Sequence, residues 1–203
     1  MDDKAQRHFK KADPILFKVL DKVIKLDGKI ENPIRHPSDY FEDLCREIVN
    51  QQLSSKAGDT IFNRFKKLLH GKITPLEVVK IKGEKIRACG LSNSKVKYIK
   101  DLAQKIVDGE VDLAKLNKLS DEDVITELIK VKGIGKWTAE MFLMFSLGRE
   151  DIFSHGDLGL KNAIKKLYSI ENPTLEQVEL ITVKWSPYRT YASRILWRSL
   201  DNK

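Results

Sequence analysis

The chain has 203 residues, 41% of them hydrophobic and 33% charged, which is typical of a globular protein with one large domain or two small ones. Its 37 basic and 29 acidic residues give a formal net charge of +8, which suits a polyanionic partner without identifying one. No apolar run approaches the roughly 20 residues of a membrane span, and two cysteines exclude a disulfide framework.

The N-terminal quarter of the chain is predicted to form two helices joined by a linker. Asp13 and Pro14 have the residue types of an N-cap and a first helical position, and Gly28 ends this helix. Residues 29–37 contain two prolines and form the linker. The next helix starts at Ser38 and places apolar residues at the spacing of a core-facing surface: Phe41, Leu44, Cys45, Ile48 and Val49.

The apolar rhythm stops at residues 50–55, Asn-Gln-Gln-Leu-Ser-Ser. Either Ser54 or Ser55 can cap the following helix, which runs to Gly71. Taken without the other motifs, the glutamine pair is best explained as a solvated turn between two helices.

Capping residues also define the helices of the middle of the chain. Thr74 begins a capping box for a short helix that ends at Gly83, and Ser92 caps a longer helix. Three lysines lie on or near the polar side of that longer helix. Such a run is more often a solvated face than a phosphate contact; the residues are Lys95, Lys97 and Lys100.

A hairpin of residues 131–135, Val-Lys-Gly-Ile-Gly, follows a helix capped by Ser120. Its paired glycines allow a tight turn and a close approach of the backbone to a bulky group. The helix after the hairpin begins with free N–H groups and a positive dipole end, which suit a phosphate. The hairpin taken alone could equally be an ordinary turn between two helices.

Asp157 stands at the start of a further helix, which runs to Tyr168. Aspartate is among the best N-cap residues, and helix amides favour the charged carboxylate. A structural and a chemical role are therefore compatible. Thr174 begins another capping box, and Pro187 opens the last helix, through Trp197. Since no segment alternates like a strand, we predict an all-α protein.

The stretch 128–160 closely resembles the helix-hairpin-helix DNA glycosylases, in particular the 3-methyladenine DNA glycosylase II branch. The resemblance extends from about Asp39 to Trp197 and includes the segments 46–65 and 184–197. It implies a two-lobed, all-α glycosylase fold with a helix-hairpin-helix motif and an active-site cleft between the lobes. The expected lobes, with approximate boundaries, are a terminal lobe of residues 1–35 with 140–203 and a middle lobe of residues 36–139 that contains the helix-hairpin-helix.

The resemblance also assigns roles to individual residues. It implies that Asp157 stabilises the positive charge that develops on the sugar and orients or activates water. Trp137 and Trp197 match aromatic base-pocket positions, with core packing as the alternative. Gln52 matches the wedge that fills the space of an extruded nucleotide. The implied DNA contacts are Gln52, Leu53, Ser54, Lys132, Gly133, Gly135, Lys136 and Thr138.

Other features of the family bear on cofactors and on the reaction subtype. Carbonyls of Val131 and Ile134 are the implied ligands of a monovalent cation, and no other metal and no cofactor is expected. Two cysteines cannot form the four-cysteine iron–sulfur motif of some relatives. The position of the Schiff-base lysine in strand-nicking relatives is occupied by Trp137, which favours an enzyme that uses water. Lys136 is one residue away from that position.

We therefore expect a monofunctional DNA glycosylase of base excision repair. It would flip out an alkylated purine of the 3-methyladenine type and hydrolyse the N-glycosidic bond, leaving an abasic site. The alternatives are a glycosylase for a deaminated or oxidised purine and a non-catalytic DNA-binding module. The expected partner is double-stranded DNA that contains damaged bases, and no membrane association is expected. The protein is expected to act as a monomer. The expected location is cytoplasmic, nucleoid-associated in a prokaryote, or nuclear in a eukaryote.

Overall fold

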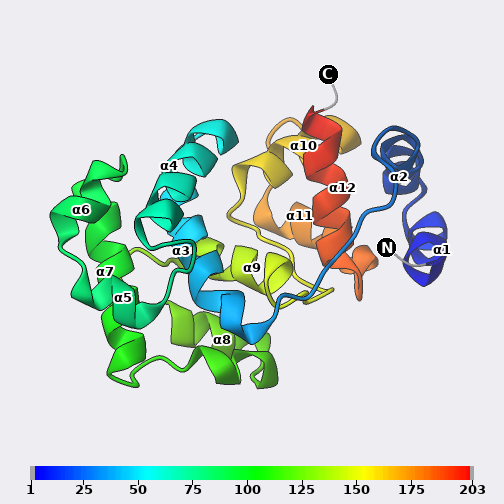
Figure 1. The fold of residues 1–203 in the computed structure, drawn as a ribbon. Helices are drawn as coiled ribbons and strands as arrows, with labels where there is room; N and C mark the ends of the chain where they lie inside the picture. The colour runs from blue at the N-terminus through cyan, green and yellow to red at the C-terminus, as the bar shows by residue number, and fades with distance from the viewer. Residues whose placement is uncertain (1–2, 202–203) are drawn as a thin grey trace. The chain divides into compact units, whose positions relative to one another are not determined.

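Helices account for all of the regular structure in residues 3–201, the part of the chain that the computed structural model describes (Figure 1). The predicted all-α class is confirmed. Within these residues, no helix is both long enough and apolar enough to cross a bilayer. The chain folds as two units: a terminal unit of Met1–Ile34 with Gly148–Lys203, and a middle unit of Arg35–Leu147.

The second boundary between the units lies between Leu147 and Gly148. Ser146 belongs to the middle unit, because its hydroxyl donates to Asp43 over 2.9 Å and its carbonyl accepts from the Arg35 amide over 2.9 Å. These bonds keep the end of α9 (Lys136–Phe145) with the middle unit.

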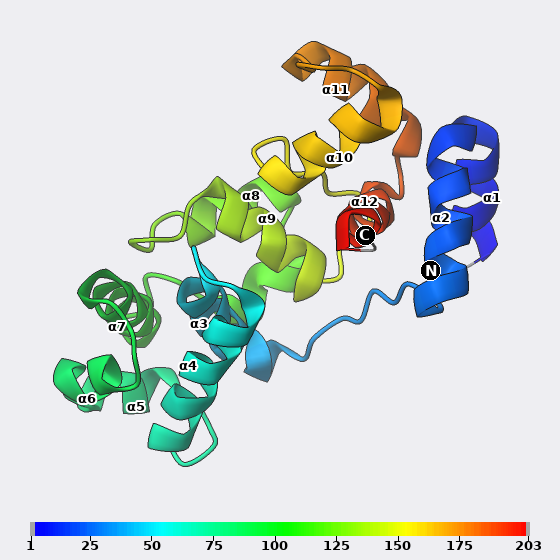
Figure 2. The same cartoon turned by 90° about the horizontal axis from the view of Figure 1, so that it is seen from above.

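In the terminal unit, α12 lies between α2 and α10 (Figures 1 and 2). Large apolar side chains from these helices, including Leu16, Leu20, Ile164 and Ile195, are fully buried between them. The helices of this unit are α1 (Asp3–Ala12), α2 (Pro14–Asp27), α10 (Leu158–Tyr168), α11 (Leu175–Thr182), η3 (Val183–Trp185) and α12 (Arg189–Asp201).

Two helix boundaries of this unit differ from the sequence prediction. Helix α1 was not predicted, and it buries Ala5 and Phe9 in the core. Helix α12 begins at Arg189, two residues after Pro187. At that start, the Arg189 guanidinium binds both carboxylate oxygens of Asp151, over 2.8 and 3.1 Å.

Asp13 links three helical segments of the terminal unit and is only 5% exposed. One carboxylate oxygen accepts from the Leu16 amide over 3.0 Å, which confirms the predicted N-cap of α2. The other oxygen accepts from the indole N–H of Trp185 over 2.8 Å and from the hydroxyl of Tyr168 over 2.5 Å. Burial and the Asp13 carboxylate hold the pKa of Tyr168 well above its usual value.

In the middle unit, α3 lies between α7 and α9 (Figures 1 and 2). The predicted apolar face of α3 is buried, which confirms it. The helices of this unit are η1 (Pro37–Asp39), α3 (Tyr40–Asn50), α4 (Ser55–Leu68), α5 (Pro75–Lys80), α6 (Gly83–Ala88), α7 (Asn93–Val107), η2 (Leu113–Lys118), α8 (Asp121–Leu128) and α9.

Two starts in the middle unit also differ from the prediction. Ser38 does not cap α3: its amide donates to the His36 ring within a 3-10 turn, and α3 begins at Tyr40. The helix that starts at Pro75 ends at Lys80, and Gly83 begins α6 instead of ending α5.

The expectation of a solvated lysine face on α7 holds for Lys97 but is wrong for its two neighbours. Lys95 donates to the carbonyls of Val49 and Gln51 over 2.8 and 2.7 Å. Lys100 donates to the carbonyls of Val79, over 3.0 Å, and Ile81. These carbonyls lie at helix C-termini, which lack intrahelical donors. Burial lowers the pKa of both ammonium groups.

We predict that Asp13→Ala lowers the free energy of unfolding by about 3 kcal/mol, because it leaves two buried donors without their acceptor and removes an N-cap. Urea unfolding followed by circular dichroism measures the change. The control is Asp21→Ala on the same helix, where an exposed ion pair with Lys25 is lost and the expected change is below about 0.5 kcal/mol. Equal effects of the two substitutions would contradict the role given to Asp13.

Glu47 on α3 generates a prediction about pH. Burial, and then the charge of Asp43, raise the pKa of Glu47 to about 7, against an opposing effect of Arg46. Folding therefore favours the protonated acid, and its contribution to stability is lost as the pH rises from the usual glutamate range through about 7. We expect Glu47→Gln to stabilise the protein by up to ~3 kcal/mol at pH 8 and much less at pH 4.5. Thermal unfolding at both pH values measures the change, with the exposed Glu31→Gln as control. A stabilisation by Glu47→Gln that is no larger at pH 8 than at pH 4.5 would contradict the prediction.

Candidate functional site

Asp157 is the N-cap of α10 and is 9% exposed. Its Oδ1 accepts from the Leu160 amide over 2.7 Å. The loop before it is anchored in the core by Phe153, whose ring meets the Trp185 ring edge-on at 5.8 Å between centroids. The acid therefore lies between a segment that is packed into the core and the helix that it starts.

Trp197, on α12, donates its indole N–H to the same Oδ1 of Asp157 over 3.0 Å. Two donors from different helices thus converge on one oxygen and fix the plane of the carboxylate. The sequence predicted Trp197 only as a base-pocket or core residue. Its hydrogen bond to Asp157 gives it a positioning role that was not anticipated.

Gly159 makes this approach of Trp197 to Asp157 possible. A Cβ atom at residue 159 would lie 3.1 Å from Asp157 Oδ1, 3.2 Å from Trp197 Cδ1 and 3.3 Å from its Nε1. A Cβ atom there would require the indole and the carboxylate to shift by a few tenths of an ångström. A glycine in the first turn of a helix is unfavourable by propensity, and this was a signal in the sequence that we did not use.

Trp137 lies in the first turn of α9, in the middle unit, and is 39% exposed. That exposure argues against core packing as its purpose. The adjacent Lys136 is 4.0 Å from Glu140, and 75% of its side chain is exposed.

The hairpin between α8 and α9 has the features that its glycines predicted. Gly133 has a φ of +84°, a region that glycine adopts without strain. Gly135 is the N-cap of α9 and supplies no side chain, so the first amides of α9 have no side-chain cap. Val131 and Ile134 are buried, and the Val131 carbonyl accepts from the Ile134 amide over 3.1 Å. A monovalent cation at these carbonyls would share Val131 with that bond.

Two predicted DNA contacts in this region are engaged within the protein. The Lys132 amide donates to Asp101 over 2.9 Å, although its side chain is 76% exposed. Thr138 is 3% exposed, and its hydroxyl accepts from Gln51 Nε2 over 3.3 Å. Any contact of Thr138 with DNA would have to come from its backbone.

The α3–α4 turn displays polar and apolar side chains at the surface. Gln52 has a φ of +57° and is exposed, Leu53 is 39% exposed, and Ser54 caps α4 by accepting from the Ala57 amide over 3.4 Å. Sequence reasoning missed the different role of Gln51. Its amide donates to the Gly133 carbonyl over 2.9 Å and so joins this turn to the hairpin.

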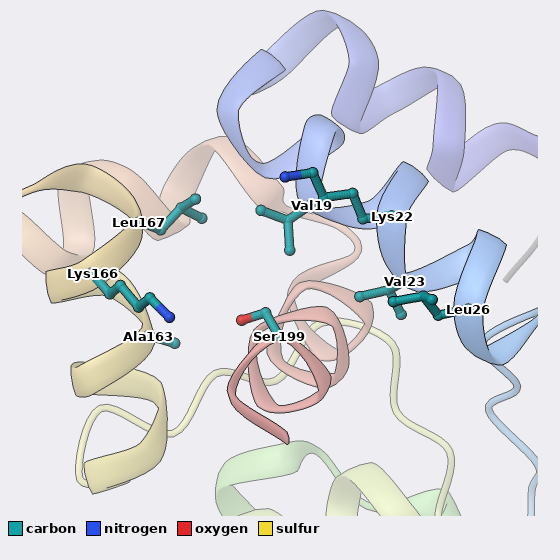
Figure 3. Close-up of a pocket in the computed structure, with 8 residues that line it drawn as sticks. All are labelled: Val19, Lys22, Val23, Leu26, Ala163, Lys166, Leu167 and Ser199. Atoms are coloured by element: carbon teal, nitrogen blue, oxygen red, sulfur yellow. The ribbon is translucent and has the colours of Figure 1, made fainter. Parts of the chain in front are cut away.

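A cavity of about 330 Å³ in the terminal unit lies elsewhere, between α2, α10 and α12 (Figure 3). Its lining contains neither Asp157 nor Trp197. The lining is aliphatic except for two lysines and a serine, which supply no carboxylate or imidazole for acid–base catalysis: Val19, Lys22, Val23, Leu26, Ala163, Lys166, Leu167 and Ser199. We therefore take the surroundings of Asp157 as the candidate site.

Comparison with known proteins places this geometry in a family. Residues 45–187 match the model of the HhH-GPD superfamily base excision DNA repair protein. The chain is 36% identical over 183 residues to DNA-3-methyladenine glycosylase 1 of Schizosaccharomyces pombe, covering 88% of this chain and 80% of the relative.

Two solved structures share the fold. One is the S. pombe 3-methyladenine DNA glycosylase in complex with abasic DNA, with a TM-score of 0.81, 34% identity, and coverage of 96% of this chain and 95% of that one. The other is a DNA-3-methyladenine glycosidase from Bacillus halodurans, with a TM-score of 0.82, 32% identity, and coverage of 99% and 90%. The chain belongs to the HhH-GPD superfamily of base excision DNA repair proteins.

Proposed function

We propose that this protein is a monofunctional DNA glycosylase of base excision repair that removes alkylated purines of the 3-methyladenine type. The observation that carries the proposal is the convergence of the Leu160 amide and the Trp197 indole on one oxygen of Asp157. The relatives named DNA-3-methyladenine glycosylase support the reaction and the substrate class.

Asp157 is proposed as the catalytic residue, acting through its carboxylate. Cleavage of the N-glycosidic bond builds positive charge on the deoxyribose as the base leaves, and a fixed carboxylate stabilises that charge. The same carboxylate orients the water that attacks the sugar. Because both donors to Oδ1 belong to the protein, little reorganisation is needed when the charge develops.

Double-stranded DNA is the proposed partner, bound by a monomer at the place in the cell where the DNA is. The first amides of α9 and the hairpin glycines offer N–H groups to a phosphate, which positions the protein without reading the sequence. At the α3–α4 turn, Gln52 and the exposed Leu53 are proposed to fill the space left by the extruded nucleotide. The Ser54 hydroxyl can donate to the DNA backbone while it accepts as a cap.

Trp137 and Trp197 are proposed as aromatic surfaces for the extruded base. A purine alkylated at a ring nitrogen is cationic, and an indole face attracts a cation. Such a base also leaves easily, so weak base-specific contacts suffice. We propose no Schiff-base step, because Trp137 occupies the position of the nucleophilic lysine of strand-nicking relatives.

We predict that Asp157→Asn lowers the single-turnover rate of base release by roughly 100-fold or more, because it removes the charge that stabilises the sugar cation. The substrates are methylated duplex DNA and duplexes with one hypoxanthine or one ethenoadenine. DNA treated with the wild-type protein is expected to show strand breaks only after alkali, because a monofunctional glycosylase leaves an abasic site with the backbone intact. DNA binding by the variant should be as tight as wild type or tighter, since a negative charge is lost.

The exposed Glu171→Gln serves as the matched control for Asp157→Asn and should release base at the wild-type rate. Equal release by wild type and Asp157→Asn would overturn the proposed mechanism. Binding by both proteins with release by neither would favour a DNA-binding module, and release of hypoxanthine alone would move the substrate class to deaminated purines.

A second prediction separates two roles of Trp197. Trp197→Phe keeps a ring for stacking but deletes the N–H that binds Asp157, so we expect the rate at saturating DNA to fall about tenfold with little change in KM. If Trp197 acted only by stacking, Trp197→Phe would retain nearly the full rate and only Trp197→Ala would lose it. Single-turnover kinetics on methylated duplex DNA, with thermal unfolding of each variant, distinguish these results.

A further inference from the structure

Helix α7 presents three side chains to the two segments that carry the candidate DNA contacts. Lys95, Tyr98 and Asp101 are spaced by three residues and therefore lie on one face of the helix. The two segments are the α3–α4 turn and the hairpin between α8 and α9, and all of them belong to the middle unit.

Lys95 holds the backbone where it enters the turn. Its ammonium donates to the carbonyls of Val49 and Gln51, at the C-terminal end of α3. A lysine held in this way satisfies carbonyls that the helix leaves without donors, and its charge is directed at the protein backbone. Two of the three donors of the Lys95 ammonium are therefore used within the protein.

The Tyr98 ring packs against the backbone of the hairpin at Gly133. A Cβ atom at Gly133 would lie 2.1 Å from Cδ2 of the Tyr98 ring, so the hairpin backbone rests directly on that ring. Gly133 is therefore required twice: once for its positive φ and once for the space that the ring occupies.

Asp101 binds the hairpin backbone itself. Its Oδ2 accepts from the Lys132 amide over 2.9 Å, and its Oδ1 lies 3.6 Å from the Lys132 ammonium. A carboxylate beside a segment that binds phosphates is unfavourable for DNA binding by charge alone. The hydrogen bond from the Lys132 amide to Asp101 instead favours DNA binding, because it holds the hairpin in place.

Gln51 joins the two segments directly, because its side-chain amide donates to the Gly133 carbonyl. Its own carbonyl accepts from Lys95. We propose that Lys95, Tyr98 and Asp101 are positioning residues that hold the turn and the hairpin at a fixed spacing, so that both segments engage one DNA duplex. This inference rests on the proposed function of those two segments as DNA contacts.

A pair of substitutions at Asp101 gives the sharpest test, because charge and positioning predict opposite signs. Asp101→Asn removes the charge but keeps an oxygen that accepts from Lys132, and it should bind DNA as tightly as wild type or up to about threefold tighter. Asp101→Ala removes the charge and the acceptor, and it should bind about tenfold more weakly. The probe is a labelled duplex with a stable abasic-site analogue, followed by fluorescence anisotropy.

A pair at Tyr98 tests the same proposal without any change of charge. Tyr98→Phe keeps the ring beneath Gly133 and should bind DNA within about twofold of wild type. Tyr98→Ala removes the ring and should bind about tenfold more weakly.

Thermal unfolding of each variant shows whether the fold is kept. If Asp101→Ala bound DNA as tightly as Asp101→Asn, the positioning proposal would be wrong, while wild-type base release would still support the proposed function. If wild type released no base but bound DNA with the predicted order of variants, positioning would stand and the glycosylase proposal would fail. Absence of DNA binding by wild type would overturn both.

Discussion

The carboxylate of Asp157 is bound by the helix that it begins, and the arrangement of the candidate site depends on this bond. Helix α10 is fixed at both ends by carboxylates: its first turn by Asp157 and its last residue, Tyr168, by Asp13. Asp13 also binds Trp185, just before α12, which carries Trp197. The position of the acid therefore depends on the packing of the whole terminal unit and not on a flexible loop.

The hydrogen bonds of Asp157 also bear on which chemistry suits it. Two N–H donors hold one oxygen of the carboxylate in place, and a carboxylate in a fixed position stabilises a cation that develops beside it without reorganisation. A carboxyl that acts as a general acid is instead typically placed in an apolar pocket that favours its neutral form. The geometry thus agrees with stabilisation of a sugar cation, and an alkylated purine leaves without the help of an acid.

Interactions between residues close in the sequence could be predicted, and interactions between residues far apart in the sequence could not. The caps at Asp13, Ser92 and Asp157 join residues three positions apart, so residue type alone predicted them. The bonds of Gln51, Lys95 and Trp197 span 82, 46 and 40 residues, and no local pattern encodes them. The chemical identity of the candidate site came from resemblance to a family, and the structure added how its residues are held.

The middle unit meets a different physical requirement from the terminal unit. Contacts with phosphates are sequence-independent. In the proposed reaction, the distinction between damaged and normal nucleotides therefore rests on how well an extruded nucleotide is placed. Placement needs the turn and the hairpin at a constant separation, and short loops alone do not fix a separation. Polar side chains fix it here by binding backbone carbonyls: Lys95 binds those at the end of α3, and Gln51 binds that of Gly133 in the hairpin. These bonds use side chains other than Gln52 and Leu53, which remain exposed at the turn for the proposed contact with DNA.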